Sequence, residues 1–171
     1  DLDGLLLNFK SKVNKKINFD FESYFEKEVK TAWFKNLYVL DSNYATFLYC
    51  IYYGGRLSGK TEAIARSIII NCTIIKNSTI LCARHVQNSI EDSVKPLLER
   101  IIEEYIEKGY IPKNHFLIKK NEIVDKNKNK IIFKGLQDWK ASDIKGLDNI
   151  KICWLEEAAF ISYKMLSYLL K

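Results

Sequence analysis

The strongest constraint on this 171-residue chain is one run, Gly54-Gly55-Arg56-Leu57-Ser58-Gly59-Lys60-Thr61, which fits the pattern G-x-x-x-x-G-K-[ST] in full. The pattern is typical of a phosphate-binding loop that joins a buried strand to a helix. Residues 45–53 are rich in aromatic and β-branched side chains and predict the strand, and residues 61–76 have helical spacing of apolar residues. An ordinary glycine turn is the alternative, but this context favours a phosphate-binding loop.

Each residue type in the loop has its own chemical reason. Gly54 and Gly59 allow a positive φ and a close backbone approach, so that successive N–H groups can converge on an anion. The N-terminus of the following helix adds partial positive charge. We expect Lys60 to reach the β- and γ-phosphate oxygens and the Thr61 hydroxyl to complete the shell of a Mg²⁺ ion. The predicted cofactors are therefore ATP and Mg²⁺.

A pair of glutamates follows a second apolar run. Residues 150–155 predict a buried strand, and Glu156 and Glu157 come directly after it. Carboxylates at this end of a strand lie where open α/β sheets bind ligands. Glutamates that open a helix are often only favourable first-turn charges, but their combination with the loop favours catalysis. We expect Glu156 to hold Mg²⁺ and Glu157 to position or deprotonate the attacking water.

The remaining apolar patterns predict the fold class. Residues 78–83 predict a further buried strand, and residues 90–105 a helix that Pro96 kinks or restarts. Residues 116–119 and 130–134 flank a lysine- and asparagine-rich turn and predict a β-hairpin. Strands that alternate with helices predict a P-loop NTPase fold of the α/β class. We expect a mostly parallel central β-sheet flanked by helices, with a β-hairpin insertion.

Composition excludes several other classes of protein. Hydrophobic residues make up 47% and charged residues 28% of the chain, which is typical of a folded protein and not of a disordered one. No run approaches the roughly 20 apolar residues that a membrane span needs, so we expect a cytoplasmic protein with no membrane partner. The four cysteines are far apart and favour small buried thiols over disulfides or a zinc site: Cys50, Cys72, Cys82 and Cys153.

Basic charge is concentrated in one stretch. Residues 108–151 contain eleven lysines and five acidic residues, and this surplus equals the whole formal net charge of +6. Such a stretch can attract phosphate backbones through counterion release. A lysine-rich turn such as residues 126–130 is more often simply solvated surface, and both interpretations stay open at this point.

The motifs together resemble the ATPase portion of the large subunit of tailed-phage terminases. The resemblance extends from about residue 49 to residue 160 and is carried by the glycine loop, Arg84, and residues 87–94, 132–135, 144–146 and 154–158. Residues 154–158, Trp-Leu-Glu-Glu-Ala, are the sharpest discriminator, because many families share the glycine loop. The resemblance implies an ATP hydrolase that couples hydrolysis to the packaging of double-stranded viral DNA into a procapsid. It also implies Walker A and Walker B roles for the loop and the glutamates.

The resemblance assigns roles to two arginines. Arg56 corresponds to the arginine that these motors carry in the Walker A loop, where it would sense or stabilise the γ-phosphate. Arg84 corresponds to an arginine after the next strand, a candidate finger acting on the nucleotide of a neighbouring subunit. Such a finger contributes on the order of 10³ to 10⁵ in rate. A solvated or helix-capping arginine is the alternative for each.

The resemblance also implies an organisation and a set of partners. We expect residues 1–44 to form a helical preamble packed on an ATPase core at residues 45–171, which is truncated at its C-terminal end and carries no nuclease domain. The expected partners are double-stranded DNA, the portal protein and the terminase small subunit. A homo-oligomeric ring on the procapsid, in the cytoplasm of the bacterial host, is also expected. The coupling motif that follows Walker B in this family lies outside these residues, so efficient hydrolysis by this fragment is not implied.

Two other functions fit the glycine loop. A P-loop kinase acting on nucleotides or small molecules would use the same loop, although no arginine-rich lid segment follows the third predicted strand. A non-catalytic prophage remnant would bind nucleotide as a structural ligand. Phosphate release stimulated by double-stranded DNA, without phosphoryl transfer to small acceptors, separates the motor from the kinase. A downstream nuclease-like segment in frame, or adjacent portal and small-subunit genes, would separate the motor from the remnant.

Overall fold

A computed structural model describes residues 51–55, 57–85, 90, 93–137, 147 and 149–169. The predicted preamble at residues 1–44, the first part of the predicted strand at residues 45–50, and Arg56 lie outside the described residues. The chain divides into two compact units. The first contains the described residues up to Ile74 and Ile101–Lys113, and the second contains Ile75–Arg100 and Asn114–Lys171.

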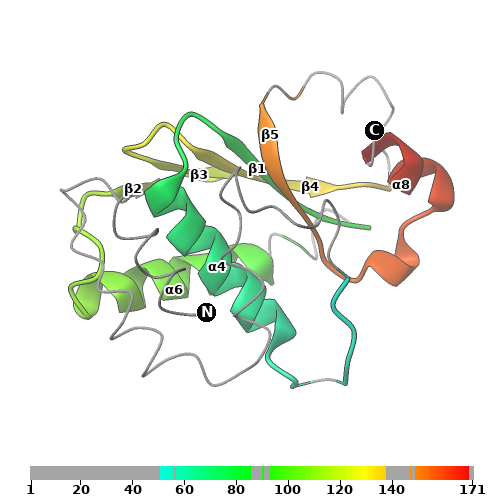
Figure 1. Cartoon of the computed structure of the whole chain (residues 1–171), viewed down its shortest axis with the longest axis horizontal. Coiled ribbons are helices and arrows are strands. Elements are labelled where there is room, and N and C mark those ends of the chain that lie inside the picture. Colours follow the sequence, from blue (N-terminus) through cyan, green and yellow to red (C-terminus); the bar gives the residue numbers. More distant parts are fainter. Residues whose placement is uncertain are drawn as a thin grey trace, which may run out of the picture. The chain divides into compact units, whose positions relative to one another are not determined.

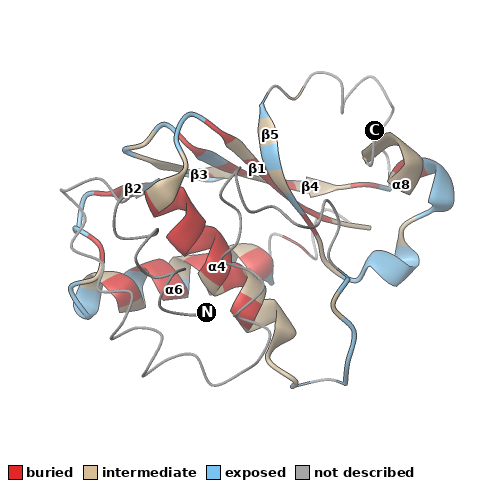
Figure 2. Cartoon of the chain, in the orientation of Figure 1, coloured by how far each residue is buried: buried red, intermediate tan, exposed pale blue. Residues whose placement is uncertain are grey.

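The first unit is helical. Helix α4 spans Lys60–Ile74 and confirms the helix predicted after the glycine loop. It begins directly after Gly59, whose carbonyl oxygen accepts a hydrogen bond from the Ala63 N–H at 2.9 Å. Its apolar residues from Ile68 to Ile70 are fully buried, and Figure 2 shows that burial continues along most of the helix.

The predicted strand before the loop is not found over residues 51–53. These residues have no regular secondary structure, and the side chains of Ile51 and Tyr53 are 87% and 84% exposed. The prediction of a buried strand is therefore wrong for this part of the run. A segment forms a strand only when a neighbouring strand pairs with its backbone, whatever its own side chains favour. None of the strands in the described part of the chain pairs with these residues.

The second unit is built on a five-stranded mixed sheet with the order β2-β3-β4-β1-β5 (Figure 1). Its strands are β1 (Thr79–Arg84), β2 (Phe116–Ile118), β3 (Glu122–Asp125), β4 (Lys130–Gly135) and β5 (Ile150–Leu155). Strand β1 is parallel to both β4 and β5, whereas β3 is antiparallel to β2 and to β4. The α/β class is confirmed, but the sheet is mixed and not mostly parallel.

The difference arises from β3, which sequence patterns missed. The predicted hairpin joined residues 116–119 directly to residues 130–134. In the structure β2 pairs with β3, which pairs in turn with β4 through the register Ile123↔Ile131. Strand β3 has only four residues, with an acidic residue at each end. Its strand character comes from its two neighbours, and short turns between adjacent strands force the antiparallel direction.

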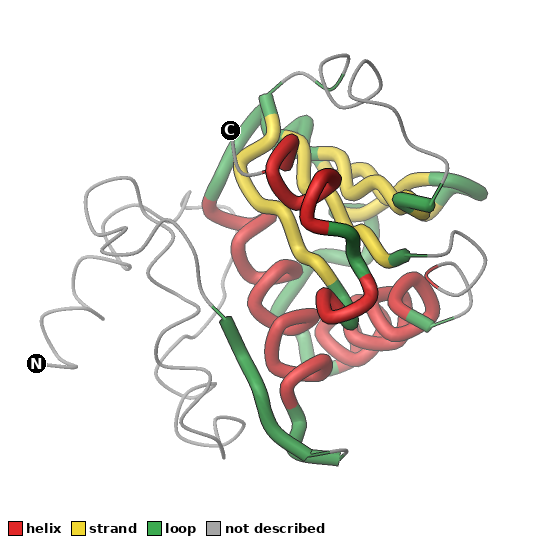
Figure 3. The backbone as a smooth tube through the Cα atoms, turned by 90° about the vertical axis from the view of Figure 1, so that its right-hand side faces the viewer, coloured by secondary structure: helices red, strands yellow, loops and turns green. Residues whose placement is uncertain are grey.

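A small apolar core covers one side of the second unit's sheet. Leu81 and Ala83 of β1 pack with Leu136 and with Met165 of helix α8 (Tyr163–Leu169). Figure 3 shows α8 beside the strands. A 3₁₀ turn, η1 (Ala158–Phe160), connects β5 to α8. The strand predicted at residues 150–155 is confirmed, but its predicted burial is not, because Lys151 and Cys153 are exposed and only Trp154 is buried. The helical stretch after the two glutamates is confirmed by α8.

Helix α6 spans Val94–Glu107 and contributes residues to both units. Pro96 lies in its first turn, where a missing N–H costs nothing, and Ile90 is already helical. The prediction was that Pro96 kinks or restarts the helix, and α6 begins at Val94 after a turn at Ser93, two residues before Pro96. None of the helices in the described part of the chain has the length and apolar character to cross a membrane. Cys72 and Cys82 are buried as predicted, but Cys153 is exposed on β5; Cys50 lies outside the described residues.

Candidate functional site

The glycine loop holds the Lys60 side chain over its own backbone. The Lys60 ammonium donates hydrogen bonds to the carbonyl oxygens of Gly54 at 2.9 Å and Gly55 at 3.0 Å, and to Ser58 Oγ at 2.9 Å. The cation is thus fixed above the loop by three oxygens. A phosphate group brought to the loop would offer this ammonium better acceptors than neutral oxygens, because hydrogen bonds to charged acceptors are stronger.

The backbone of the loop has the conformation that the glycines were expected to allow. Gly54 has φ 157° and Gly59 has φ 81°, which confirms a positive φ at both positions. Between them Leu57 also has a positive φ, 63°, and its side chain is fully exposed at the tip of the loop. A bulky residue in this conformation is uncommon and marks a constrained turn. The role of Ser58 as a partner of Lys60 was missed, and no sequence signal distinguishes it from other loop serines.

In the second unit, β1 and β5 end at the same edge of the sheet. The two strands are parallel and aligned, with Ala83 opposite Leu155. The Glu156 N–H extends this pairing and donates to the Ala83 carbonyl oxygen at 2.9 Å. Arg84, Glu156 and Glu157 therefore leave the sheet together at its carboxyl edge, where α/β folds bind ligands.

Arg84 and Glu157 form an ion pair. The Arg84 Nε–H donates to Glu157 Oε2 at 3.1 Å, and the Nη2 group contacts the same oxygen. The Nη1 group lies 3.4 Å from Ser93 Oγ. The candidate finger is therefore engaged with the candidate catalytic glutamate of its own chain. Its expected action on a neighbouring subunit stays a prediction.

Glu156 has a different partner, which sequence reasoning missed. The buried Trp154 donates its indole N–H to Glu156 Oε2 at 3.0 Å. Residues i and i+2 lie on the same face of an extended segment, and this spacing was the available signal. Glu157 itself has left-handed backbone angles, φ 51° and ψ 47°. This change of backbone direction sends the two neighbouring carboxylates to different partners.

The predicted site residues thus form two groups. Gly54, Gly55, Leu57, Ser58, Gly59, Lys60 and Thr61 belong to the first unit, and Arg84, Glu156 and Glu157 to the second. The meeting of the two groups around one nucleotide stays a prediction, as does a Mg²⁺ site at Thr61 and Glu156. Among the described residues no group of three or more His, Cys, Asp or Glu side chains is placed to hold a metal ion by itself.

The fold and these two groups define a class: an α/β protein with a glycine loop at a helix N-terminus and acidic and basic side chains at the carboxyl edge of its sheet. The family model described as phage terminase large subunit matches residues 47–171. The chain therefore belongs to the phage terminase large subunit family.

A solved structure shares the fold. The large terminase from a thermophilic bacteriophage superposes with a TM-score of 0.53 at 18% sequence identity. The match covers 67% of this chain and 28% of the bacteriophage chain, so this chain spans little more than a quarter of that protein. No curated protein sequence matches this chain.

Proposed function

We propose that this chain is the ATPase domain of a DNA-packaging motor, which hydrolyses ATP to drive double-stranded viral DNA into a procapsid. The observation that carries the proposal is the Lys60 ammonium, which is held by three loop oxygens at the start of α4. Membership of the terminase large subunit family supports the choice of DNA packaging.

The loop residues are suited to hold the phosphates of ATP. Gly54 and Gly59 have no Cβ atom to obstruct a phosphate, and this absence also allows their positive φ. N–H groups at the start of α4 attract negative charge. Lys60 would exchange its carbonyl partners for phosphate oxygens, and Arg56 would add a second positive charge. Thr61 and Glu156 would hold Mg²⁺, with Trp154 fixing the Glu156 carboxylate. Bound Mg²⁺ and ATP supply a γ-phosphoryl group whose charge the metal neutralises.

Glu157 is the proposed base. A carboxylate that orients the attacking water and accepts its proton must be held in place. The ion pair with Arg84 supports this requirement, because it fixes the position of the Glu157 carboxylate. Arg84 would then act first as a positioning residue for Glu157 and, when released, as a source of positive charge toward the transferred phosphate.

The test compares three variants of the same chain. Lys60→Ala is expected to abolish binding of a fluorescent ATP analogue, whereas Glu157→Gln is expected to bind it normally and to release no phosphate. Lys164→Ala, which removes an exposed lysine of α8, serves as the control and should match the parent. Normal ATP hydrolysis by Glu157→Gln would contradict the assigned role of Glu157.

The same assays separate the motor from the other two candidates. Phosphate release that double-stranded DNA stimulates supports the motor. Transfer of the phosphoryl group to a small acceptor would instead identify a kinase. Binding of ATP without turnover under any condition would identify a non-catalytic remnant. The portal protein, the terminase small subunit and further copies of the chain in a ring are the partners that the motor would require.

A further inference from the structure

Three segments that are distant in sequence meet at the amino edge of the second unit's sheet. The Asn77 N–H donates to the Asn127 carbonyl oxygen at 2.9 Å, which joins the start of β1 to the turn between β3 and β4. The Thr79 N–H donates to the Asn149 carbonyl oxygen at 2.9 Å and joins the same segment to the start of β5. Residues 76–79, 125–130 and 149–151 are therefore neighbours through their backbones.

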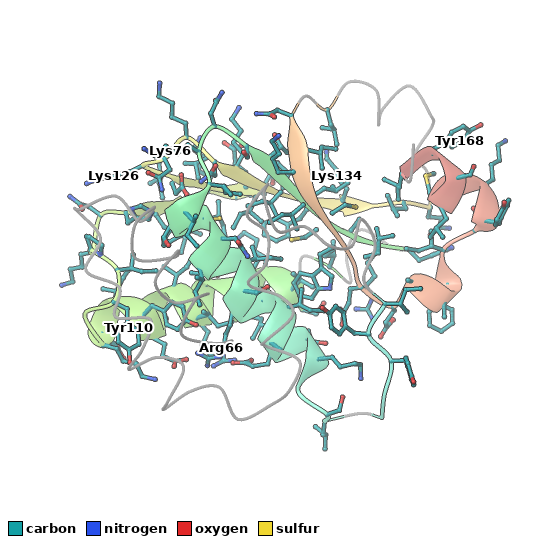
Figure 4. The ribbon with its side chains drawn as sticks, viewed as in Figure 1. Arg66, Lys76, Tyr110, Lys126, Lys134 and Tyr168 are labelled. Carbon is teal, nitrogen blue, oxygen red and sulfur yellow. The ribbon has the colours of Figure 1, made fainter. Side chains whose placement is uncertain are left out.

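Each of these segments presents lysine to solvent. The surface, which we call the amino-edge lysine surface, comprises Lys76, Lys126, Lys128, Lys130 and Lys151, all of them exposed. Figure 4 shows Lys76 and Lys126 on this side of the sheet. Lys151 lies at an irregularity in the β1–β5 register, since Thr79 faces Ile150 but Ile80 faces Ile152. Such a bulge re-aims the skipped side chain.

The one carboxylate of these three segments is buried and does not form part of the amino-edge lysine surface. This acidic residue is Asp125, whose side chain is 1% exposed. Its carboxylate accepts hydrogen bonds from the Asn129 backbone N–H at 2.9 Å and the Asn129 side-chain amide at 2.8 Å. Burial raises the pKa of Asp125, although these hydrogen bonds oppose the shift. The buried His115 lies 4.0 Å from the same carboxylate, and burial lowers the pKa of this imidazole.

The lysines stand on a rigid frame. The Asn129 side chain is buried, accepts a hydrogen bond from the Ser78 N–H at 3.1 Å and donates one to the Ile75 carbonyl oxygen at 2.8 Å. The turn is closed by the Lys128 N–H, which donates to the Asp125 carbonyl oxygen at 3.1 Å. Lys128 has φ 64°, which an unconstrained lysine rarely adopts. Lysines that are only solvated do not require a backbone held by these hydrogen bonds. Lysines on a backbone that is already ordered lose less conformational entropy when they bind a partner.

We propose that the amino-edge lysine surface binds the sugar-phosphate backbone of double-stranded DNA, independently of base sequence. Lysine ammonium groups neutralise phosphates as point charges and read no base edges, which fits a partner whose sequence varies along its length. The proposal rests on the proposed packaging function and adds the location of the DNA. That location is the edge of the sheet opposite to Arg84 and Glu157, so DNA and catalytic side chains would occupy the two ends of β1 and β5.

The experiment measures duplex binding by the whole chain as a function of salt. The test variant is Lys126→Gln/Lys128→Gln/Lys130→Gln. The control variant is Lys119→Gln/Lys120→Gln/Lys164→Gln, which removes the same charge from exposed residues at the other end of β3 and on α8. A labelled duplex of random sequence is titrated between about 50 and 200 mM salt, and the slope of log affinity against log salt is compared.

The test variant is expected to reduce that slope by about 2.7, or about 0.9 for each lost phosphate contact, while the control retains the parental slope. Equal slopes for the two variants would overturn the proposal. The absence of duplex binding by the parent at the lowest salt would also overturn it. So would a test variant that binds the duplex like the parent but has lost the binding of the parent to anionic phosphatidylserine vesicles.

Binding of a fluorescent ATP analogue is followed in parallel, and it separates the two proposals. If all three proteins bind nucleotide but show equal slopes, the DNA surface is wrong and the proposed ATPase is untouched. If the slopes differ as expected but none of the proteins binds nucleotide, the proposed ATPase function is contradicted. The amino-edge lysine surface is then still supported as a duplex-binding site.

Discussion

Gly55 and Gly59 lie in the same loop, but of the two only Gly59 has a backbone angle that other residues rarely adopt. Gly59 has φ 81°, whereas the φ of Gly55 is not positive, and a Cβ atom built on either glycine would touch nothing within 4 Å. Backbone strain is therefore the whole difference between them. Gly59→Ala is expected to lower the free energy of unfolding by about 1 kcal/mol. Gly55→Ala is expected to change it by less than about 0.5 kcal/mol. Urea denaturation checks both, and equal losses would contradict the argument.

Trp154 is a second residue whose role is visible only in the structure. Its indole N–H fixes the Glu156 carboxylate, and Trp154→Phe keeps an aromatic ring but removes this donor. If Glu156 holds Mg²⁺, the variant should require on the order of 10-fold more Mg²⁺ for half-maximal ATP hydrolysis, as losses in the outer shell of metal sites do. ATP affinity without Mg²⁺ should be unchanged. A fall in stability with an unchanged Mg²⁺ requirement would mean that Trp154 only fills space.

At the level of elements, one arginine links α4 to α6 within the first unit. Arg66 donates from Nη1 and Nη2 to the two carboxylate oxygens of Glu104, at 3.1 and 2.7 Å, and from Nε to Glu62 at 2.9 Å. The guanidinium carbon lies 5.7 Å from the ring centre of Tyr105, which is fully buried. Burial alone would raise the pKa of Glu104, but hydrogen bonds from Arg66 and Lys108 outweigh it and lower the pKa to about 2.

The lowered pKa predicts an acid-sensitive contribution to stability. The folded chain binds the Glu104 proton less readily than the unfolded chain. The contribution is therefore complete above the ordinary pKa of about 4.5 and is lost as the pH falls toward 2. Glu104→Gln is expected to lower the free energy of unfolding by on the order of 2 kcal/mol at neutral pH, and the difference should shrink below about pH 4. Glu122→Gln, which removes the partner of Lys119 in a solvent-exposed pair, is the control and should cost little. A pH-independent difference would contradict the ion-pair explanation.

The elements that sequence patterns predicted are those whose own residues determine their state. Strands β1 and β5 are runs of mostly apolar residues, and α4 starts where the glycine loop ends, so each was predicted within a few residues. Strand β3 and residues 51–53 show the opposite case. The four residues of β3 form a strand because β2 and β4 lie beside them, and Ile51 and Tyr53 have strand-like side chains without a strand partner among the described residues. Pairing of this kind depends on contacts that no local pattern encodes.

At the scale of the whole molecule, the same limit applies to the candidate site. Residue types and spacing predict the loop and the two glutamates as a candidate site, because phosphate and metal chemistry restricts which side chains can serve. The partners that fix them were not predictable, since Ser58, Ser93 and Trp154 become neighbours of Lys60, Arg84 and Glu156 only through folding. The pairing of Arg84 with Glu157 matters most, because it offers action within one chain as the alternative to the predicted action on a neighbouring subunit.

Mixing two inactive variants distinguishes action within a chain from action between chains. Lys60→Ala keeps Arg84 but should not bind nucleotide, and Arg84→Ala keeps the loop but lacks the arginine. If Arg84 served a neighbouring subunit, as the family resemblance implied, mixed assemblies would recover ATP hydrolysis. Because Arg84 contacts Glu157 of its own chain, we expect no recovery. The mixture is assayed where native mass spectrometry detects both subunits in one assembly. Activity above the sum of the separate variants would mean that Arg84 leaves Glu157 to act across the subunit interface.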